Sequence, residues 1–164
     1  MPTAILIPAP SPRFPFLFVT QVKLNSLANN RGWVLGHDDG GYDRALALHD
    51  DRFGGIAAPN GGTYRSKLGM PPLHTWMHVV ATFEHGKKCP IFLRIAGKPT
   101  RSLSDSRVDN SGDGKGDLYV GGQQMYAGHT IDGFIGEVRV YDHRLTSTQA
   151  AMRFKASCAR FGAC

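Results

Sequence analysis

The chain has 164 residues, a formal net charge of +6 at pH 7 and 41% hydrophobic residues. This length fits one domain, no run approaches the ~18 consecutive apolar residues of a membrane span, and no motif of a nucleic-acid-binding module is present. Eleven Asp against two Glu, with 20 Gly and 10 Pro, are typical of many short strands joined by turns, so the composition predicts an all-β domain.

Residues 1–15 contain five prolines and lack the positive start and uninterrupted apolar core of a secretory signal, which predicts an extended Pro-rich arm. Alternation of side chains then predicts a strand over Phe16–Leu24, and two further runs predict a hairpin. Those two runs are Trp33–Gly36 and Arg44–His49.

Later strands are predicted by apolar runs bounded by Gly, Pro or Asp: 63–64, 76–83, 91–95, 118–120 and 134–141. In the last of these, strict alternation places Phe134, Val138 and Val140 on one face with Gly136. Glu137, Arg139 and Tyr141 then take the other face, where we expect Glu137 and Arg139 to make surface charge contacts across the sheet. The intervening stretches, 49–55 and 102–116, are predicted to be turns and loops.

The pair Thr146 and Gln149 has the capping-box spacing, which predicts a short helix as far as Phe154. Residues 155–164 are predicted to be a C-terminal tail. Of the three cysteines, Cys158 and Cys164 are near enough in sequence to close a small loop, with Cys89 left over; three free thiols are the alternative.

Three stretches carry a family resemblance: WMHVVATF at 76–83, LYVGG at 118–122 and DGFIGEVRVYDHRL at 132–145. Together they resemble laminin-G-like domains of the concanavalin A-like lectin and glucanase superfamily, over residues 16–154. The resemblance implies an antiparallel two-sheet jelly-roll sandwich with a short C-terminal helix, rim loops that bind calcium, and an extracellular or secreted location. It differs at Gln21, where an aromatic residue is expected, and it lacks the family's first strand.

A candidate calcium loop begins at Asp109. Oxygen-bearing residues stand at its positions 1, 3, 5 and 9, with Gly at 6, which is the spacing of the early ligands of a calcium loop. These residues are Asp109, Ser111, Asp113 and Asp117. Position 12 is Val120 in place of a bidentate Glu, so an EF-hand is excluded; a looser oxygen cage and a solvated loop stay open.

A rival acidic group contains Asp38, Asp39 and Asp43, with Asp50 and Asp51 further along the chain. The resemblance makes this hairpin region a second candidate for calcium. His37 and His49 flank the group, but the spacing lacks the paired Cys or His typical of zinc sites, so surface histidines are favoured.

Sugar binding requires aromatic faces beside planar polar groups. Residues near predicted loops that offer these are Tyr42, Arg44, Asn60, Tyr64 and Tyr126. Trp33 and Trp76 lie in predicted strands, so we expect both to be core or near-core residues.

Related glucanases use paired carboxylates on one strand, about 5–5.5 Å apart in retaining enzymes. The matching strand here offers Glu137 alone, and Glu84 ends a different strand. The sequence therefore predicts a non-catalytic recognition module that binds a glycan or glycoprotein through rim loops, with Ca²⁺ as the candidate cofactor. The alternative is a structural or assembly subunit that meets a protein partner or its own copy through a sheet edge; a glycoside hydrolase is less favoured.

Overall fold

The computed structural model describes most of the strands, the helix and several connections. The described residues are 16–27, 32–37, 44–49, 52–56, 63–65, 70–84, 86–95, 98, 101–108, 117–122 and 128–161. The 1–15 arm lies outside them.

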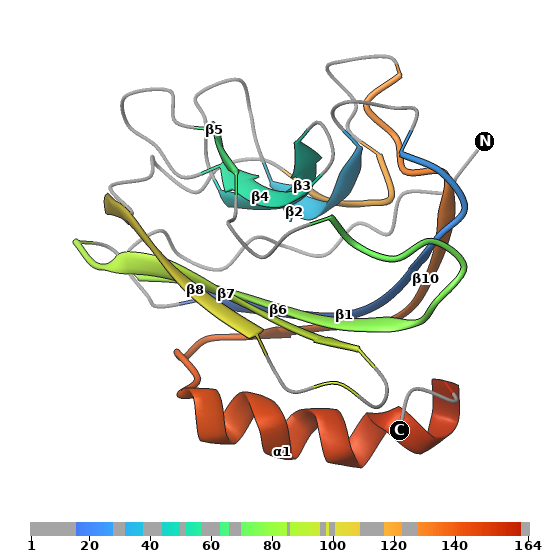
Figure 1. Cartoon of the computed structure of the whole chain (residues 1–164). Helices are drawn as coiled ribbons and strands as arrows, with labels where there is room; N and C mark the ends of the chain where they lie inside the picture. The colour runs from blue at the N-terminus through green and yellow to red at the C-terminus, as the bar shows by residue number, and fades with distance from the viewer. Residues whose placement is uncertain are drawn as a thin grey trace.

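Two five-stranded sheets pack face to face as a jelly-roll sandwich, with one helix beneath the lower sheet (Figure 1). Sheet A has the order β10-β1-β6-β7-β8 and sheet B the order β5-β4-β3-β2-β9. The strands are β1 (Phe16–Leu24), β2 (Trp33–His37), β3 (Arg44–His49), β4 (Arg52–Ile56), β5 (Thr63–Arg65), β6 (Met77–Phe83), β7 (Lys88–Ile95), β8 (Arg101–Val108), β9 (Leu118–Val120) and β10 (Gly133–Tyr141). Neighbouring strands in both sheets run antiparallel, so the predicted fold class is confirmed.

The core lies between the two sheets and is built from alternate positions of the strands. Phe18 and Val22 on β1, Val79 and Ala81 on β6 and Leu46 on β3 belong to one cluster of buried side chains. Each is buried because the strand period of two turns it away from solvent and toward the facing sheet. The alternation of apolar residues along the strands therefore determines which side chains form the core between the two sheets.

Two strands were not predicted. β4 has the sequence RFGGI, and its Gly-Gly pair was interpreted as a turn. β8 has the sequence RSLSDSRV, which was interpreted as part of a polar loop. Both interpretations are wrong, because β4 is hydrogen-bonded between β3 and β5 and β8 pairs with β7. Hydrogen bonding to neighbouring strands stabilises β4 and β8 as strands, although their short or polar sequences do not predict strands on their own.

A β-bulge interrupts β10. Thr20 of β1 pairs with Val138, whereas Val22 pairs with Ile135, so β10 has one extra residue between these pairs. Ile135 therefore packs against the core with Val138, and Phe134 is 53% exposed. The prediction that Phe134 shares the face of Val138 is wrong, because the bulge reverses the alternation.

Helix α1 (Ser147–Cys158) starts at the predicted capping box: the Thr146 hydroxyl accepts from the Gln149 backbone N–H, and the Gln149 side chain accepts from the Thr146 backbone N–H. The helix runs four residues past Phe154 and continues into the 3₁₀ turn η1 (Ala159–Phe161). It lies across the outer face of sheet A (Figure 1). Its first turns bury Ala150 in a cluster with Val80 and Phe92 of that face, so α1 completes a third layer.

Gln21 lies in this helix–sheet layer rather than between the sheets. Its amide Nε2 lies 2.8 Å from Nδ1 of His78 and donates to the Ser157 hydroxyl at 3.0 Å. A polar residue at the position where an aromatic was expected therefore joins β1, β6 and α1 in one buried network. Such a network favours a single register of the helix on the sheet, since other registers would leave its groups unpaired.

Candidate functional site

The candidate site lies at the end of sheet B where three connections leave neighbouring strands. His37, at the end of β2, pairs with Arg44, at the start of β3, and with Leu118 of β9. On the other side of β3, Ala45 pairs with Ile56, where β4 ends. The connections 38–43, 57–62 and 109–116 therefore leave from one edge. We call this end of the sandwich, marked by His37, Arg44, Ile56 and Asp117, the loop rim.

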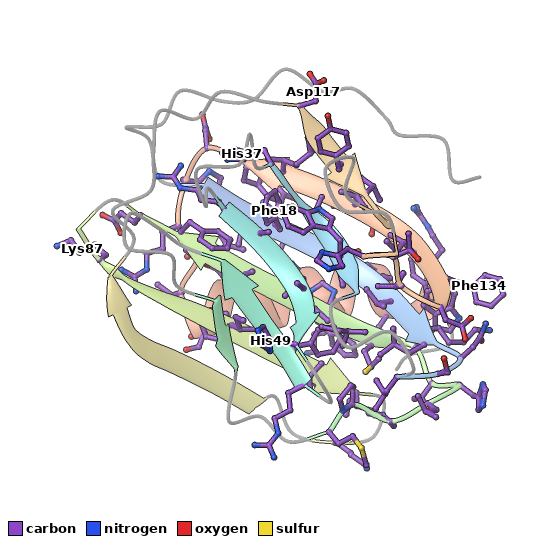
Figure 2. All side chains as sticks on the ribbon, turned by 90° about the horizontal axis from the view of Figure 1, so that it is seen from above. Phe18, His37, His49, Lys87, Asp117 and Phe134 are labelled. Carbon is purple, nitrogen blue, oxygen red and sulfur yellow. The ribbon has the colours of Figure 1, made fainter. Side chains whose placement is uncertain are left out.

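The loop rim brings together the strand ends that flank both predicted calcium groups. Asp38, Asp39, Asp43 and Tyr42 belong to the first connection, Asn60 to the second, and Asp109, Ser111 and Asp113 to the third; all lie outside the described residues. Asp117 is described, and Figure 2 places it near His37 at one end of the sandwich. The two calcium predictions, made as rivals, thus concern adjacent stretches of one rim.

Asp117 is exposed and its carboxylate is held by a neighbour. The pKa of Tyr119 is raised, and burial of the phenol is the largest cause. The negative charge of Asp117 and the hydrogen bond that the phenol donates to the Asp117 carboxylate raise this pKa further. The carboxylate is therefore oriented while lone pairs remain for a further ligand.

His37 and Arg44 form the floor of the loop rim. Each is only 1% exposed, although both stand at strand ends. Contact between the deeply buried Arg44 side chain and a ligand stays a prediction. Tyr64 belongs to β5, opposite Gly55 of β4, so its backbone lies one residue inside sheet B from Ile56 at the loop rim.

Other predicted residues lie at the opposite end. The turn that carries Asp50 and Asp51 joins His49 to Arg52, at the far end of β3 from Arg44. With about 3.3 Å per residue, the six residues of β3 separate the two turns by roughly 17 Å. Asp50 and Asp51 lie outside the described residues, and the strand register does not favour the hypothesis that all five Asp belong to one group. Tyr126, outside the described residues, belongs to a connection that leaves β9 at this same far end, where the Gly121 N–H donates to Val34.

The far end of sheet A carries a second group of polar and aromatic side chains that the sequence did not identify. Asp132 accepts from the Asn25 amide at 3.2 Å and from the Ser26 hydroxyl at 2.6 Å. The His74 N–H donates to the Leu24 carbonyl at 2.7 Å. We call this end, formed by Asn25, Ser26, His74, Asp132 and Phe134, the aromatic rim. Figure 2 shows Phe134 projecting away from the sandwich.

The two tryptophans lie where expected. Trp33 is 2% exposed in the core. Trp76 is half-buried on the helix side of sheet A, with its ring 5.1 Å from that of Phe161. The prediction that both are core or near-core residues is confirmed.

The two glutamates have structural partners. Glu137 accepts from Arg139 Nε at 2.9 Å and forms an ion pair with Arg160 at 3.5 Å. Glu84 pairs with Arg144 at 3.2 Å. Glu137 and Arg139 thus make a charge contact with each other along β10, whereas the prediction was of contacts across the sheet.

Within the described ranges, no group of three or more His, Cys, Asp or Glu side chains is placed to hold a metal ion. No helix among the described residues is long and apolar enough to cross a membrane.

Two antiparallel sheets in jelly-roll order, with connections gathered at one end, define a concanavalin A-like sandwich. A laminin G model of the concanavalin A-like lectin/glucanases superfamily matches residues 19–151. The chain therefore belongs to this superfamily, as a laminin G-like domain, and the resemblance found in the sequence is confirmed.

Solved structures share the fold at low sequence identity. A Bacteroides ovatus protein to which carbohydrate binding is ascribed matches with a TM-score of 0.64 and 15% identity over 90% of this chain and 42% of that chain. Trypanosoma rangeli sialidase in complex with sialic acid matches with 0.59 and 18%, over 87% of this chain and 23% of that chain. Domains LG4-5 of the mouse laminin α1 chain match with 0.53 and 17%, over 84% and 37%.

The chain thus spans less than half the length of these structures, and the matches establish the fold alone. They include both binding proteins and an enzyme. Among curated protein sequences, none matches the chain.

Proposed function

We propose that this domain is a non-catalytic recognition module that binds carbohydrate through the loop rim. The observation that supports this proposal is the strand register, which brings the connections containing Tyr42, Asn60 and both acidic groups to one end of sheet B. Convergent loops on a rigid sandwich are a common arrangement for ligand recognition. The similarity to a Bacteroides ovatus protein with ascribed carbohydrate binding adds support.

Calcium is the proposed cofactor of this rim. Carboxylate and hydroxyl oxygens are the ligands that Ca²⁺ prefers, and the oriented, exposed carboxylate of Asp117 fits this chemistry. Asp109, Ser111 and Asp113 would complete the set, with Asp38, Asp39 or Asp43 from the adjacent connection. Bound calcium would order the loops and offer free coordination positions to the oxygen atoms of sugar hydroxyls.

The absence of catalysis is part of the proposal. A retaining glycosidase needs a second carboxyl about 5–5.5 Å from the first, and the Glu137 carboxylate is instead paired with two arginines on the outer face of sheet A. We therefore expect no release of reducing ends from β-glucans by the purified chain, in the parent or in a Glu137→Gln variant.

An extracellular or secreted location is also proposed. Cys158 is disulfide-bonded, and disulfides persist mainly in oxidising compartments.

A glycan array with calcium, and again with chelator, tests the proposal. We expect selective binding at the loop rim that is lost with chelator, and calorimetry should show calcium binding to the parent that is abolished in Asp109→Ala and reduced in Asp117→Asn. Asp142→Asn is the matched control, because Asp142 is an exposed carboxylate beyond the end of β10. Equal calcium binding in all three variants would remove the metal from the proposal, and silence on the array would remove the glycan.

The second candidate is an assembly subunit, favoured by the edge position of β10. Among the described strands, β10 pairs with β1 alone, and an edge strand can accept a strand from a partner. A stable calcium-independent oligomer that is lost on deletion of residues 1–15 would support this candidate, and a monomer at high concentration would oppose it.

A further inference from the structure

Phe134 is unusual among the aromatic residues of this domain because the β-bulge turns it outward. Its ring is 53% exposed, one of four large apolar side chains exposed in the described part of the chain. A second one, Leu73, precedes His74 on the same rim. A single exposed apolar side chain is ordinary at a protein surface, so the case for a ligand depends on how this ring is held and on its neighbours.

The position of Phe134 is fixed on both sides. The Lys23 ammonium lies 4.8 Å from its ring centroid and 5.4 Å from that of Trp76, and such cation–π contacts hold a ring at a defined angle. Next to it, Gly133 allows β10 to approach β1 closely, since a Cβ there would meet the Lys23 carbonyl oxygen and the Leu24 Cα. The ring is therefore preorganised rather than free to fold back.

Planar polar groups lie at the same strand ends as Phe134: Asp132 precedes Gly133, which pairs with Leu24, and Asn25 follows Leu24. The Asp132 carboxylate is anchored by Asn25 and Ser26, and these hydrogen bonds lower its pKa below the ordinary value. A carboxylate has about four acceptor positions, of which these contacts use two. Among the described residues, the amide oxygen of Asn25 and the imidazole of His74 have no hydrogen-bond partner, so both can bind a ligand.

His74 adds an observation of backbone strain. Its φ is 56°, in the left-handed region that is uncommon for a residue with a side chain. Residues held in such conformations are strained and cluster at functional sites. The turn holds His74 in this conformation because the His74 backbone N–H donates to the Leu24 carbonyl. The His74 side chain is also one of the groups that lower the pKa of Asp132.

From this arrangement we infer that the aromatic rim is a second, calcium-independent site for a neutral pyranose residue. One C–H face of the sugar stacks on Phe134. Neighbouring sugar hydroxyls donate hydrogen bonds to Asp132 and form hydrogen bonds with Asn25 and His74. We specify a neutral sugar because the ionised Asp132 repels uronic or sialic acids. The Lys23 ammonium lies over the rings of Trp76 and Phe134 and is therefore not directed at a sugar carboxylate. The site lies at the opposite end from the loop rim and is independent of the function proposed there.

An array that carries neutral, sialylated and sulfated glycans, probed in chelator, tests this inference. We expect neutral glycans to be bound by the parent, and Phe134→Ala to weaken that binding at least about fivefold, since an aromatic contact contributes roughly 1 kcal/mol beyond its buried area. His74→Gly should weaken it about fivefold through a lost hydrogen bond while keeping the left-handed backbone.

Met152→Ala is the matched control, because Met152 is 58% exposed on α1, away from this rim, and its binding should equal that of the parent. Circular dichroism verifies the fold of each variant. The inference is overturned by no neutral glycan bound in chelator, by binding confined to anionic glycans, or by equal binding of Phe134→Ala and the parent. Glycan binding that chelator removes belongs to the loop rim, whereas neutral-glycan binding that persists in chelator belongs to the aromatic rim.

Discussion

His78 lies on β6 beneath helix α1, where it is 3% exposed. Burial lowers the pKa of its imidazole to about 4. The negative charge of Glu137 on β10 acts in the opposite direction, whereas Arg139 on the same strand and Arg94 on β7 lower the pKa further. Because the Gln21 amide donates to Nδ1, the neutral ring carries its proton on Nε2, and protonation of Nδ1 would break this contact.

We therefore expect acid to destabilise the domain through His78. The unfolded chain binds the proton near pH 6.5 and the folded chain only near pH 4, so the free energy of unfolding falls as pH drops through this window. The loss should reach about 2 kcal/mol between pH 7 and pH 5. Urea unfolding of the parent, His78→Gln and His143→Gln at both pH values measures it.

The variants separate His78 from other titrating groups. His143 is exposed beside Asp142, so His143→Gln should keep the pH dependence of the parent, whereas His78→Gln should lose most of it. The same slope in all three proteins would show that His78 is not responsible.

At the scale of elements, the bulge in β10 serves a packing purpose. It places Gly136 on the outer face of sheet A, where the Phe161 ring lies directly over it; a Cβ at this position would overlap the ring. The same ring packs on Trp76. The missing side chain thus lets the 3₁₀ turn after α1 close against two strands.

Gly136→Ala should destabilise the domain by roughly 1–3 kcal/mol, because overpacking must displace Phe161. A double-mutant cycle with Phe161→Ala checks the cause: in that background the alanine should cost little. If Gly136→Ala costs as much without the Phe161 ring as with it, the close contact is not the origin of the effect.

The sequence predicted those elements whose signal is local. Alternation marked β1, β6 and β10, and the Thr146–Gln149 pair marked the start of α1. The bulge was missed because FIGEVRVY alternates without a break; the extra residue is visible only against the register of β1. The helix was predicted too short because packing of Phe154 and Cys158 on Trp76 and Phe161, not local propensity, extends it.

The candidate site was predictable only in part for the same reason. Acidic and aromatic residues could be recognised as ligand types, but their grouping depends on which strands are neighbours. The pairing of His37 with both Arg44 and Leu118 joins two stretches about 80 residues apart, and no spacing rule within one stretch carries that information. The aromatic rim was missed because Phe134 had been assigned to the core face.

At the scale of the whole molecule, the direction of α1 across sheet A determines which cysteine can reach Cys158. Ala150 packs with Phe92, and Phe154 then packs on Arg94, so the helix advances along β7 in the direction of its chain. Cys158 follows at the Trp76 end. Cys89 belongs to the beginning of β7, at the other end of this path.

The separation is too large for a disulfide between Cys89 and Cys158. Three strand residues from Cys89 to Phe92 span about 10 Å, and eight helical residues from Ala150 to Cys158 add about 12 Å, whereas bridged Cα atoms lie within about 7 Å. Since Cys158 is disulfide-bonded, we expect Cys164 to be its partner. After alkylation without reductant, tryptic peptides 156–160 and 161–164 should stay joined, and peptide 89–94 should carry the label on Cys89. A link between 89–94 and 156–160 would contradict the path of α1 along β7, because that bond requires the helix to run in the reverse direction.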